Sequence, residues 1–314
     1  MIDRNDLQEL NIAVLMGGSS REREVSLASG AAVLDALRTG GYQVRAIDAT
    51  GEAWWNQLAD IDLAFNSLHG PGGEGGVVQG LLDTMGIVGT GSNVLGSTLA
   101  LDKPRSKLLW QALNLPTPSF ELVEDPSALE SLLDRWGSLF LKPAFEGSSI
   151  GVSQVSEVGQ IEAAWDRASS CKGPVMAEAF VDGPEYTVTI LGDRTLPPIR
   201  ISSQEQFYDY AAKYELDTTR YHIPCGLADS KEQELCDLAL AAFQALGCEV
   251  WGRVDVMATE ADQALQLLEV NTIPGMTGHS LVPKAAAAAG LSFLELVEEV
   301  LRLSWNNRGR EEES

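Results

Sequence analysis

Basic residues are scarce in this sequence. Of its 314 residues, 22 are Lys or Arg and 45 are Asp or Glu, giving a formal charge of -23. Such an acidic surface repels phosphate backbones and anionic lipid headgroups. The composition therefore argues against nucleic acids and membrane surfaces as partners.

Cysteine is also rare, and long apolar runs are absent. The four cysteines, Cys171, Cys225, Cys236 and Cys248, form neither a paired metal motif nor a disulfide framework, so we expect reduced, mostly buried thiols. The chain has no signal-peptide pattern and no apolar run of membrane-spanning length. We therefore expect a cytoplasmic protein.

The remaining composition is that of a globular protein. Hydrophobic residues make up 45% and charged residues 21%, which excludes disorder for the bulk of the chain. The length exceeds what one small core holds and predicts two or three lobes.

The first lobe is predicted to span residues 1–100. An apolar strand at Ile12–Met16 ends in a glycine turn, and helical periodicity follows over Val25–Leu37. Further strands are predicted at Val44–Ile47 and Leu63–Asn66. This alternation predicts an α/β lobe with a parallel sheet.

Two more lobes and a tail are predicted beyond residue 100. Residues 101–182 have short mixed α and β patterns, whereas residues 183–305 combine β-rich segments with a long amphipathic helix. The third lobe is predicted to be antiparallel. The polar residues 306–314 are predicted to be a frayed tail.

The turn after the first strand is a candidate ligand site. It lacks both the G-x-G-x-x-G order of dinucleotide-binding folds and the Gly-Lys-Ser/Thr of a P-loop. It places Glu22 at the carboxyl end of a parallel strand, where such sheets bind ligands. We expect Glu22 to contact a cationic ligand group, whereas Glu24 and Ser26 can equally be helix-start residues.

A second candidate is the segment from His69 to Gly76, which contains five glycines in eight positions. So many glycines indicate a close backbone approach, although a flexible surface loop is the alternative. His69 follows a strand end, and only that position favours a functional role over a structural one.

A third candidate is Lys142 with the small-residue loop at residues 146–151. A strand-end lysine and a loop of Gly and Ser N–H groups can bind phosphates. A plain hairpin with a surface lysine is the alternative.

The most informative pattern lies on two adjacent strands. A hairpin turn at residues 260–263 pairs Arg253 with Asn271 and Asp255 with Glu269 on one face. Two opposed carboxylates need a cation between them, and these oxygen ligands suit Mg²⁺. A solvent-facing acidic patch is the alternative, but the flanking positions are apolar. In the following irregular stretch the Gly275 N–H can serve as an oxyanion donor, although a plain connecting loop remains possible.

A set of motifs follows in order along the chain: GGSSREREVS from Gly17, LHG from Leu68, LDK from Leu101, KP at Lys142, EGSS from Glu146, GPE from Gly183, FYDYAAKY from Phe207, WGRVDVM from Trp251, EVNT from Glu269 and PGMT from Pro274. Taken together, these features resemble the D-alanine–D-alanine ligase family of the ATP-grasp superfamily, and the resemblance covers essentially the whole chain to about Leu303. The resemblance implies a three-lobed ATP-grasp fold.

The resemblance also implies a ligand set. ATP is a substrate, two Mg²⁺ (or Mn²⁺) are cofactors, and the metals would be held by Asp255, Glu269 and Asn271. The implied ATP-binding residues are Lys103, Lys142, Ser149, Glu178, Val181, Glu185 and Lys213.

The reaction implied is ligation of two D-alanines through an acyl phosphate, which supplies a peptidoglycan precursor. The first D-alanine binds near Glu22 and His69, and Ser280 and Leu281 hold the carboxylate of the second. Arg253 and the Gly275 N–H stabilise the tetrahedral intermediate. The implied lid closure joins Glu22, Ser148 and Tyr214, and the family habit is a homodimer.

Four positions depart from the family pattern. Ala179 stands where a lysine reaching adenine is usual, and Pro71, Gly75 and Ile273 replace polar or charged residues. The alternatives are a dipeptide ligase for L-amino acids and a regulatory nucleotide-binding protein without catalysis. The intact metal and oxyanion positions argue against the second alternative.

Overall fold

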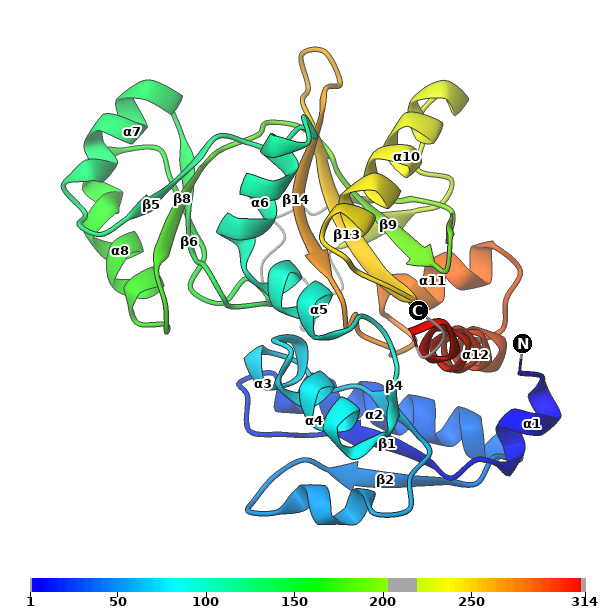
Figure 1. Cartoon of the computed structure of the whole chain (residues 1–314). Helices are drawn as coiled ribbons and strands as arrows, with labels where there is room; N and C mark the ends of the chain where they lie inside the picture. Colours follow the sequence, from blue (N-terminus) through cyan, green and yellow to red (C-terminus); the bar gives the residue numbers. More distant parts are fainter. Residues whose placement is uncertain (1, 203–218, 312–314) are drawn as a thin grey trace.

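The computed structural model describes residues 2–202 and 219–311. Within these ranges the chain forms three β-sheets, each packed against helices (Figure 1). Lys213 and Tyr214 lie outside the described residues. Among the described residues, no helix is both long and apolar enough to cross a membrane.

The first sheet is parallel and has four strands. They are β1 (Ile12–Met16), β2 (Val44–Asp48), β3 (Leu63–Asn66) and β4 (Val88–Gly89), in the order β2-β1-β3-β4. Every residue of β1 is buried because helices cover both faces. The covering helices are α2 (Arg23–Thr39) and α12 (Phe293–Glu311) on one face and α4 (Val77–Met85) on the other. The predicted parallel α/β lobe is confirmed.

The predicted frayed tail is wrong for residues 306–311, because α12 continues as a helix to Glu311. Two contacts hold its end. The backbone N–H of Ile2 donates to Asn306 Oδ1 at 3.0 Å, and Arg308 donates to the Gly86 carbonyl at 2.6 Å.

The second sheet is antiparallel, with two helices packed on it at the left of Figure 1. Its strands are β5 (Phe120–Val123), β6 (Leu139–Pro143), β7 (Ser153–Val155) and β8 (Val175–Ala179), in the order β5-β8-β6-β7. The helices are α7 (Ala128–Trp136) and α8 (Ile161–Ser169).

The third sheet is also antiparallel, as predicted. Its strands are β9 (Glu185–Leu191), β10 (Arg194–Thr195), β11 (Ile199–Ser202), β12 (Arg220–His222), β13 (Trp251–Ala258) and β14 (Leu265–Asn271). The main order is β12-β11-β9-β13-β14, with β10 beside β9. The long helix α10 (Asp229–Ala245) packs on one face of this sheet.

Two consecutive helices, α5 (Val94–Leu101) and α6 (Lys103–Ala112), connect the first lobe to the rest of the chain. Although α6 lies just beyond the predicted boundary, it packs against the core of the third sheet rather than the second. Trp110 is fully buried there, and its indole N–H donates to the Ala242 carbonyl at 3.1 Å. The domain boundaries themselves stay predictions.

The predicted register of the β13–β14 hairpin is confirmed. Arg253 pairs with Asn271 and Asp255 with Glu269, but the next residue, Val256, pairs with Leu267. Leu268 is therefore the extra residue of a β-bulge that the sequence pattern did not indicate.

The glycine-rich segment after β3 contains a short helix, α3 (Pro71–Glu74), rather than a continuous loop. The predicted close approach occurs at Gly73, where an added Cβ would lie 1.9 Å from the Leu68 carbonyl oxygen. Remaining short elements are α1 (Arg4–Glu9), η1 (Trp54–Leu58), η2 (Val158–Gln160) and α11 (Leu281–Ala288).

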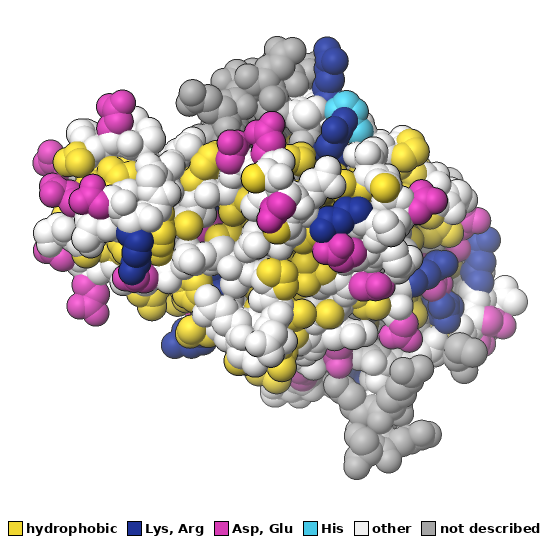
Figure 2. Space-filling model, turned by 90° about the horizontal axis from the view of Figure 1, so that it is seen from above, with side chains coloured by type: hydrophobic (Ala, Val, Ile, Leu, Met, Phe, Trp, Pro, Cys, Tyr) yellow, Lys and Arg dark blue, Asp and Glu magenta, His cyan; other side chains and the backbone are white. Residues whose placement is uncertain are grey.

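All four cysteines are free thiols. Cys225 and Cys248 are buried, and Cys171 and Cys236 are partly exposed. Acidic side chains are spread over the face in Figure 2, and the Lys and Arg side chains there are interspersed with them.

Candidate active site

A cavity of about 520 Å³ lies between the second and third sheets. Its volume is in the range that holds a nucleotide-sized ligand. Most of the predicted ATP and metal residues line it: Lys103, Lys142, Ser149, Glu178, Val181, Glu185, Asp255 and Glu269. The fold thus brings together residues that are separated by up to 166 positions in the chain.

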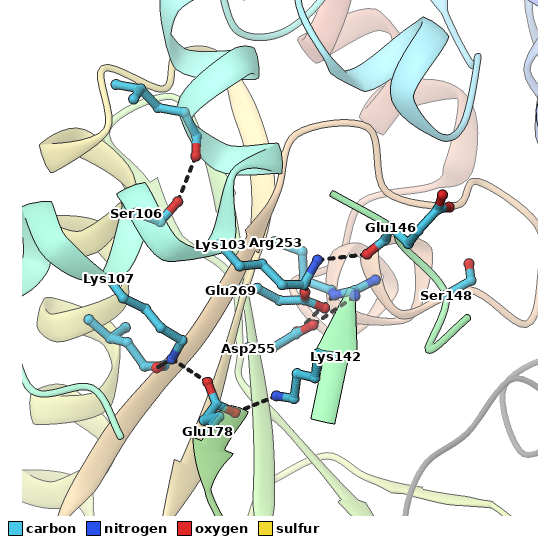
Figure 3. A network of polar contacts seen from close by, with 12 residues as sticks. Lys103, Ser106, Lys107, Lys142, Glu146, Ser148, Glu178, Arg253, Asp255 and Glu269 are labelled. Atoms are coloured by element: carbon cyan, nitrogen blue, oxygen red, sulfur yellow. Dashed lines mark hydrogen bonds and ion pairs between the residues drawn. The ribbon is translucent and has the colours of Figure 1, made fainter. Parts of the chain in front are cut away.

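One wall of the cavity carries a buried charge network. Lys142 on β6 donates to Glu178 on β8, and Lys107 on α6 forms an ion pair with the same carboxylate at 2.6 Å (Figure 3). Burial alone raises the pKa of Glu178, but the two ammonium groups outweigh it and hold that pKa below its ordinary value. Glu178 is therefore a buried anion facing a binding cavity.

The opposite wall carries the predicted metal carboxylates. Arg253 donates to both oxygens of Asp255 at 2.8 Å, and Thr187 donates to Asp255 Oδ1 at 2.8 Å. Lys103 lies 3.2 Å from Glu269 and donates to the Glu146 carbonyl at 2.7 Å. Each carboxylate is thus paired with its own cation.

These donors fit Mg²⁺ bound together with a substrate. Asp255 and Glu269 are opposed on neighbouring strands and both reach the cavity. In residues 2–202 and 219–311, no three His, Cys, Asp or Glu side chains form a preformed metal cluster. Mg²⁺ commonly uses one or two carboxylates plus substrate phosphates and water, so this donor set fits it. Asn271 Oδ1 accepts the Ile273 N–H at 3.1 Å, which leaves one of its lone pairs for a ligand.

The first lobe contributes Glu22, at the start of α2. Glu22 is buried, and Ser148 from the loop after β6 donates to its Oε1. Ser148 and Ser149 have φ values of 49° and 58°, a conformation that costs energy in non-glycine residues and is found at ligand-binding loops. The predicted phosphate loop therefore contacts the predicted amino-acid site.

His69 lies in the same region and is neutral. Its Nδ1 lies 2.9 Å from the Ser67 carbonyl, which fixes the proton on Nδ1. Nε2 is buried and has no hydrogen-bond partner among the described residues. Burial lowers the pKa of His69, against the opposing effect of the Ser67 carbonyl and Glu22. Nε2 is thus an available acceptor.

The segment after β14 packs on α2. The Met276 N–H donates to Ser29 Oγ at 3.1 Å, and the Thr277 N–H donates to Ser280 Oγ at 3.0 Å. A Cβ at Gly275 would lie 2.9 Å from Ser280 Oγ, so this backbone needs a glycine or a shift of Ser280. Leu281 is buried at the start of α11.

Sequence reasoning missed two buried charged residues. Lys107 is fully buried, and Glu74 on α3 has a pKa raised well above its ordinary value, first by burial and then by Glu22. Helical spacing from Lys103 and Trp110 could have placed Lys107 on an inward face. Nothing in the glycine-rich pattern pointed to Glu74.

The three-lobed fold and the cavity between its second and third sheets define an ATP-grasp protein. Family models for the D-ala D-ala ligase N-terminus and C-terminus match residues 11–60 and 109–302. A D-alanine–D-alanine ligase of Pseudomonas putida is 50% identical over 300 residues, covering 95% of this chain and 94% of the relative.

Solved structures of similar proteins belong to the same family. The D-alanine–D-alanine ligase of Bacillus anthracis superposes with a TM-score of 0.86 at 33% identity, covering 96% of this chain and 99% of the other. Its complex with ATP gives 0.85 at 31% identity, with the same coverage. This chain belongs to the D-alanine–D-alanine ligase family.

Proposed function

We propose that this protein joins two D-alanines into D-alanyl-D-alanine and converts ATP to ADP and phosphate. The observation that carries the proposal is the contact between Ser148 and Glu22, which puts a buried carboxylate from the first lobe beside the nucleotide-sized cavity. The names of the relatives support the choice of amino acid.

In this proposal the nucleotide lies between the second and third sheets. Lys103 and Lys142 face its phosphates, and the Ser149 loop covers them. Mg²⁺ or Mn²⁺, when bound, would neutralise part of the phosphate charge. Asp255, Glu269 and Asn271 would hold it. Val181 and Glu185 contact the base and ribose of the nucleotide. Lys213 is assigned to ATP binding from the sequence alone.

The first D-alanine binds with its ammonium group at Glu22. One of its carboxylate oxygens attacks the γ-phosphorus, the bond to the β-phosphate oxygen breaks, and ADP leaves. The product is an acyl phosphate. His69 Nε2 accepts a hydrogen bond from the amino acid, because its lone pair is available on the buried side of the ring.

The second D-alanine then attacks the acyl carbon with its amine, and phosphate leaves. The incoming ammonium loses one proton before the attack and a second as the amide forms. Arg253 and the Gly275 N–H stabilise the tetrahedral oxyanion, and Ser280 and Leu281 hold the second carboxylate. The proposal also includes a cytoplasmic location and a homodimeric state for the protein. Its product would serve as a precursor of peptidoglycan.

The test is ADP release with single amino acids from a panel of D- and L-enantiomers, in the presence of Mg²⁺. Release that requires D-alanine, with D-alanyl-D-alanine as product, supports the proposal. Release with L-amino acids alone would identify an L-dipeptide ligase, and no release with any amino acid would favour a regulatory nucleotide-binding protein.

A further inference from the structure

Lys107 is an unusual feature of α6, because its side chain is fully buried and its ammonium group has one ion-pair partner and two hydrogen-bond acceptors. Its ammonium group lies 2.6 Å from Glu178 Oε2 (Figure 3). It also lies 2.7 Å from Thr117 Oγ1 and 3.2 Å from the Leu267 carbonyl oxygen. An ammonium group has three N–H donors, and three oxygen atoms lie within 3.2 Å of this one. The group is held in one position.

The three acceptors belong to different parts of the fold. Glu178 is on β8 of the second sheet, Leu267 is on β14 of the third, and Thr117 lies in the segment between α6 and β5. Lys107 thus joins the two sheets that enclose the nucleotide-sized cavity, although it is not among the residues that line the cavity.

The contact on β14 falls at the β-bulge. The Leu267 carbonyl also accepts the Thr117 hydroxyl at 2.8 Å, and the Leu267 N–H donates to the Pro116 carbonyl at 2.9 Å. The next two residues, Leu268 and Glu269, line the cavity. Lys107 and Thr117 therefore fix the backbone from which these two side chains project.

Stability alone does not account for Lys107. Burying an ammonium group costs several kcal/mol, and replacing a buried ion pair with apolar residues of similar volume is often neutral or stabilising. A buried lysine that links two cavity walls is better explained by a geometric role.

We propose that Lys107 is a positioning residue for ATP. It holds Glu178, and through it Lys142, at a fixed place relative to the bulge at Leu267–Glu269, so the two walls are set before the nucleotide arrives. The choice of ATP as ligand rests on the proposed function.

The test is Lys107→Met, which keeps the apolar stem and removes the ammonium group. We expect the KM for ATP to rise about tenfold, since at least one charged hydrogen bond that orders the site is lost. The values of kcat and of KM for D-alanine should change much less. Trp110→Phe is the matched control, because it removes one buried hydrogen bond from the same helix without touching Glu178.

Two further variants keep the test informative if Lys107→Met does not fold. Thr117→Val retains Lys107 but removes the hydroxyl that bridges it to Leu267, and should raise the ATP KM by a smaller factor. The double variant Lys107→Met/Glu178→Gln removes both charges of the Lys107–Glu178 pair and leaves a neutral amide opposite Lys142, so its unfolding should be closer to that of the parent than the unfolding of Lys107→Met is.

Calorimetric titration with a non-hydrolysable ATP analogue, without D-alanine, separates this inference from the proposed function. Weaker analogue binding by folded Lys107→Met or Thr117→Val, but not by Trp110→Phe, supports the positioning role. Parent-like binding and KM in a folded Lys107→Met variant would overturn it, as would an equal effect of Trp110→Phe. Absence of D-alanine-dependent turnover in the parent would refute only the function.

Discussion

Arg253 and Asp255 lie two residues apart on β13, and the arginine side chain holds both oxygens of the carboxylate at 2.8 Å. The opposed Glu269 has its own partner in Lys103. The sequence led us to expect two carboxylates that repel each other until a metal binds. The structure instead pairs each with a cation, so the metal must share or replace these contacts.

Asp255→Asn tests the metal assignment. We expect turnover that depends on Mg²⁺ to be lost, because the substitution removes one of the two negative charges in the ligand set and leaves only a neutral oxygen in its place. The free energy of unfolding should fall by about 1–3 kcal/mol, since Arg253 loses a charged partner. ADP production across a Mg²⁺ titration measures the first effect and chemical denaturation the second. Asp262→Asn in the exposed hairpin turn is the control. Parent-like turnover at ordinary Mg²⁺ would refute the assignment.

Arg253→Ala tests the oxyanion role. We expect kcat to fall by about 10²–10³, with a much smaller change in KM, because the guanidinium acts where negative charge develops. Steady-state kinetics at several Mg²⁺ concentrations make the measurement. Since Arg253 also holds Asp255, recovery of kcat at high Mg²⁺ would show that the arginine acts through the metal site. A pure KM effect would mean that the residue is misplaced in our mechanism.

The sequence predicted what local patterns encode. The strand at Ile12–Met16 followed from its apolar run, and the pairing of Asp255 with Glu269 followed from a two-residue period and a polar turn. Both patterns lie within a short stretch of chain. Once the hairpin turn is assigned to residues 260–263, the pairing of the two strands follows directly.

Tertiary contacts decided the rest. At the helical end of the chain, Asn306 and Arg308 form hydrogen bonds with the backbone of Ile2 and Gly86. The polar composition of residues 306–314 does not indicate these contacts, because their partners lie far away in the sequence. Beside the bulge at Leu268, the backbone of Leu267 forms hydrogen bonds with Pro116 and Thr117, about 150 residues earlier in the chain. The partners of Lys107 likewise come from three separate segments.

Ala179→Lys tests the departure from the family pattern. Ala179 ends β8 and lines the cavity, so a lysine here has room to reach the nucleotide. We expect tighter binding of a non-hydrolysable ATP analogue, by about 1 kcal/mol for one added hydrogen bond. Calorimetric titration is the measurement, and Ala179→Met controls for side-chain length. Equal or weaker binding by the lysine variant would indicate that another group already fills this role.

His69→Asn tests the neutral, buried state of the histidine through the pH dependence of stability. The pKa of His69 is lowered in the folded protein, so between the folded pKa and the unfolded value of about 6.5 the unfolded chain binds more protons. The parent should therefore lose stability as pH falls below about 6.5, with a slope contribution of at most about 1.4 kcal/mol per pH unit. The variant lacks this contribution, so the difference in unfolding free energy between parent and variant should be constant above about pH 7 and shrink toward acid pH. Chemical denaturation across this range measures it, and His279→Asn, at an exposed position, is the control. A difference that does not vary with pH would mean that His69 takes up its proton in the folded state as readily as in the unfolded chain.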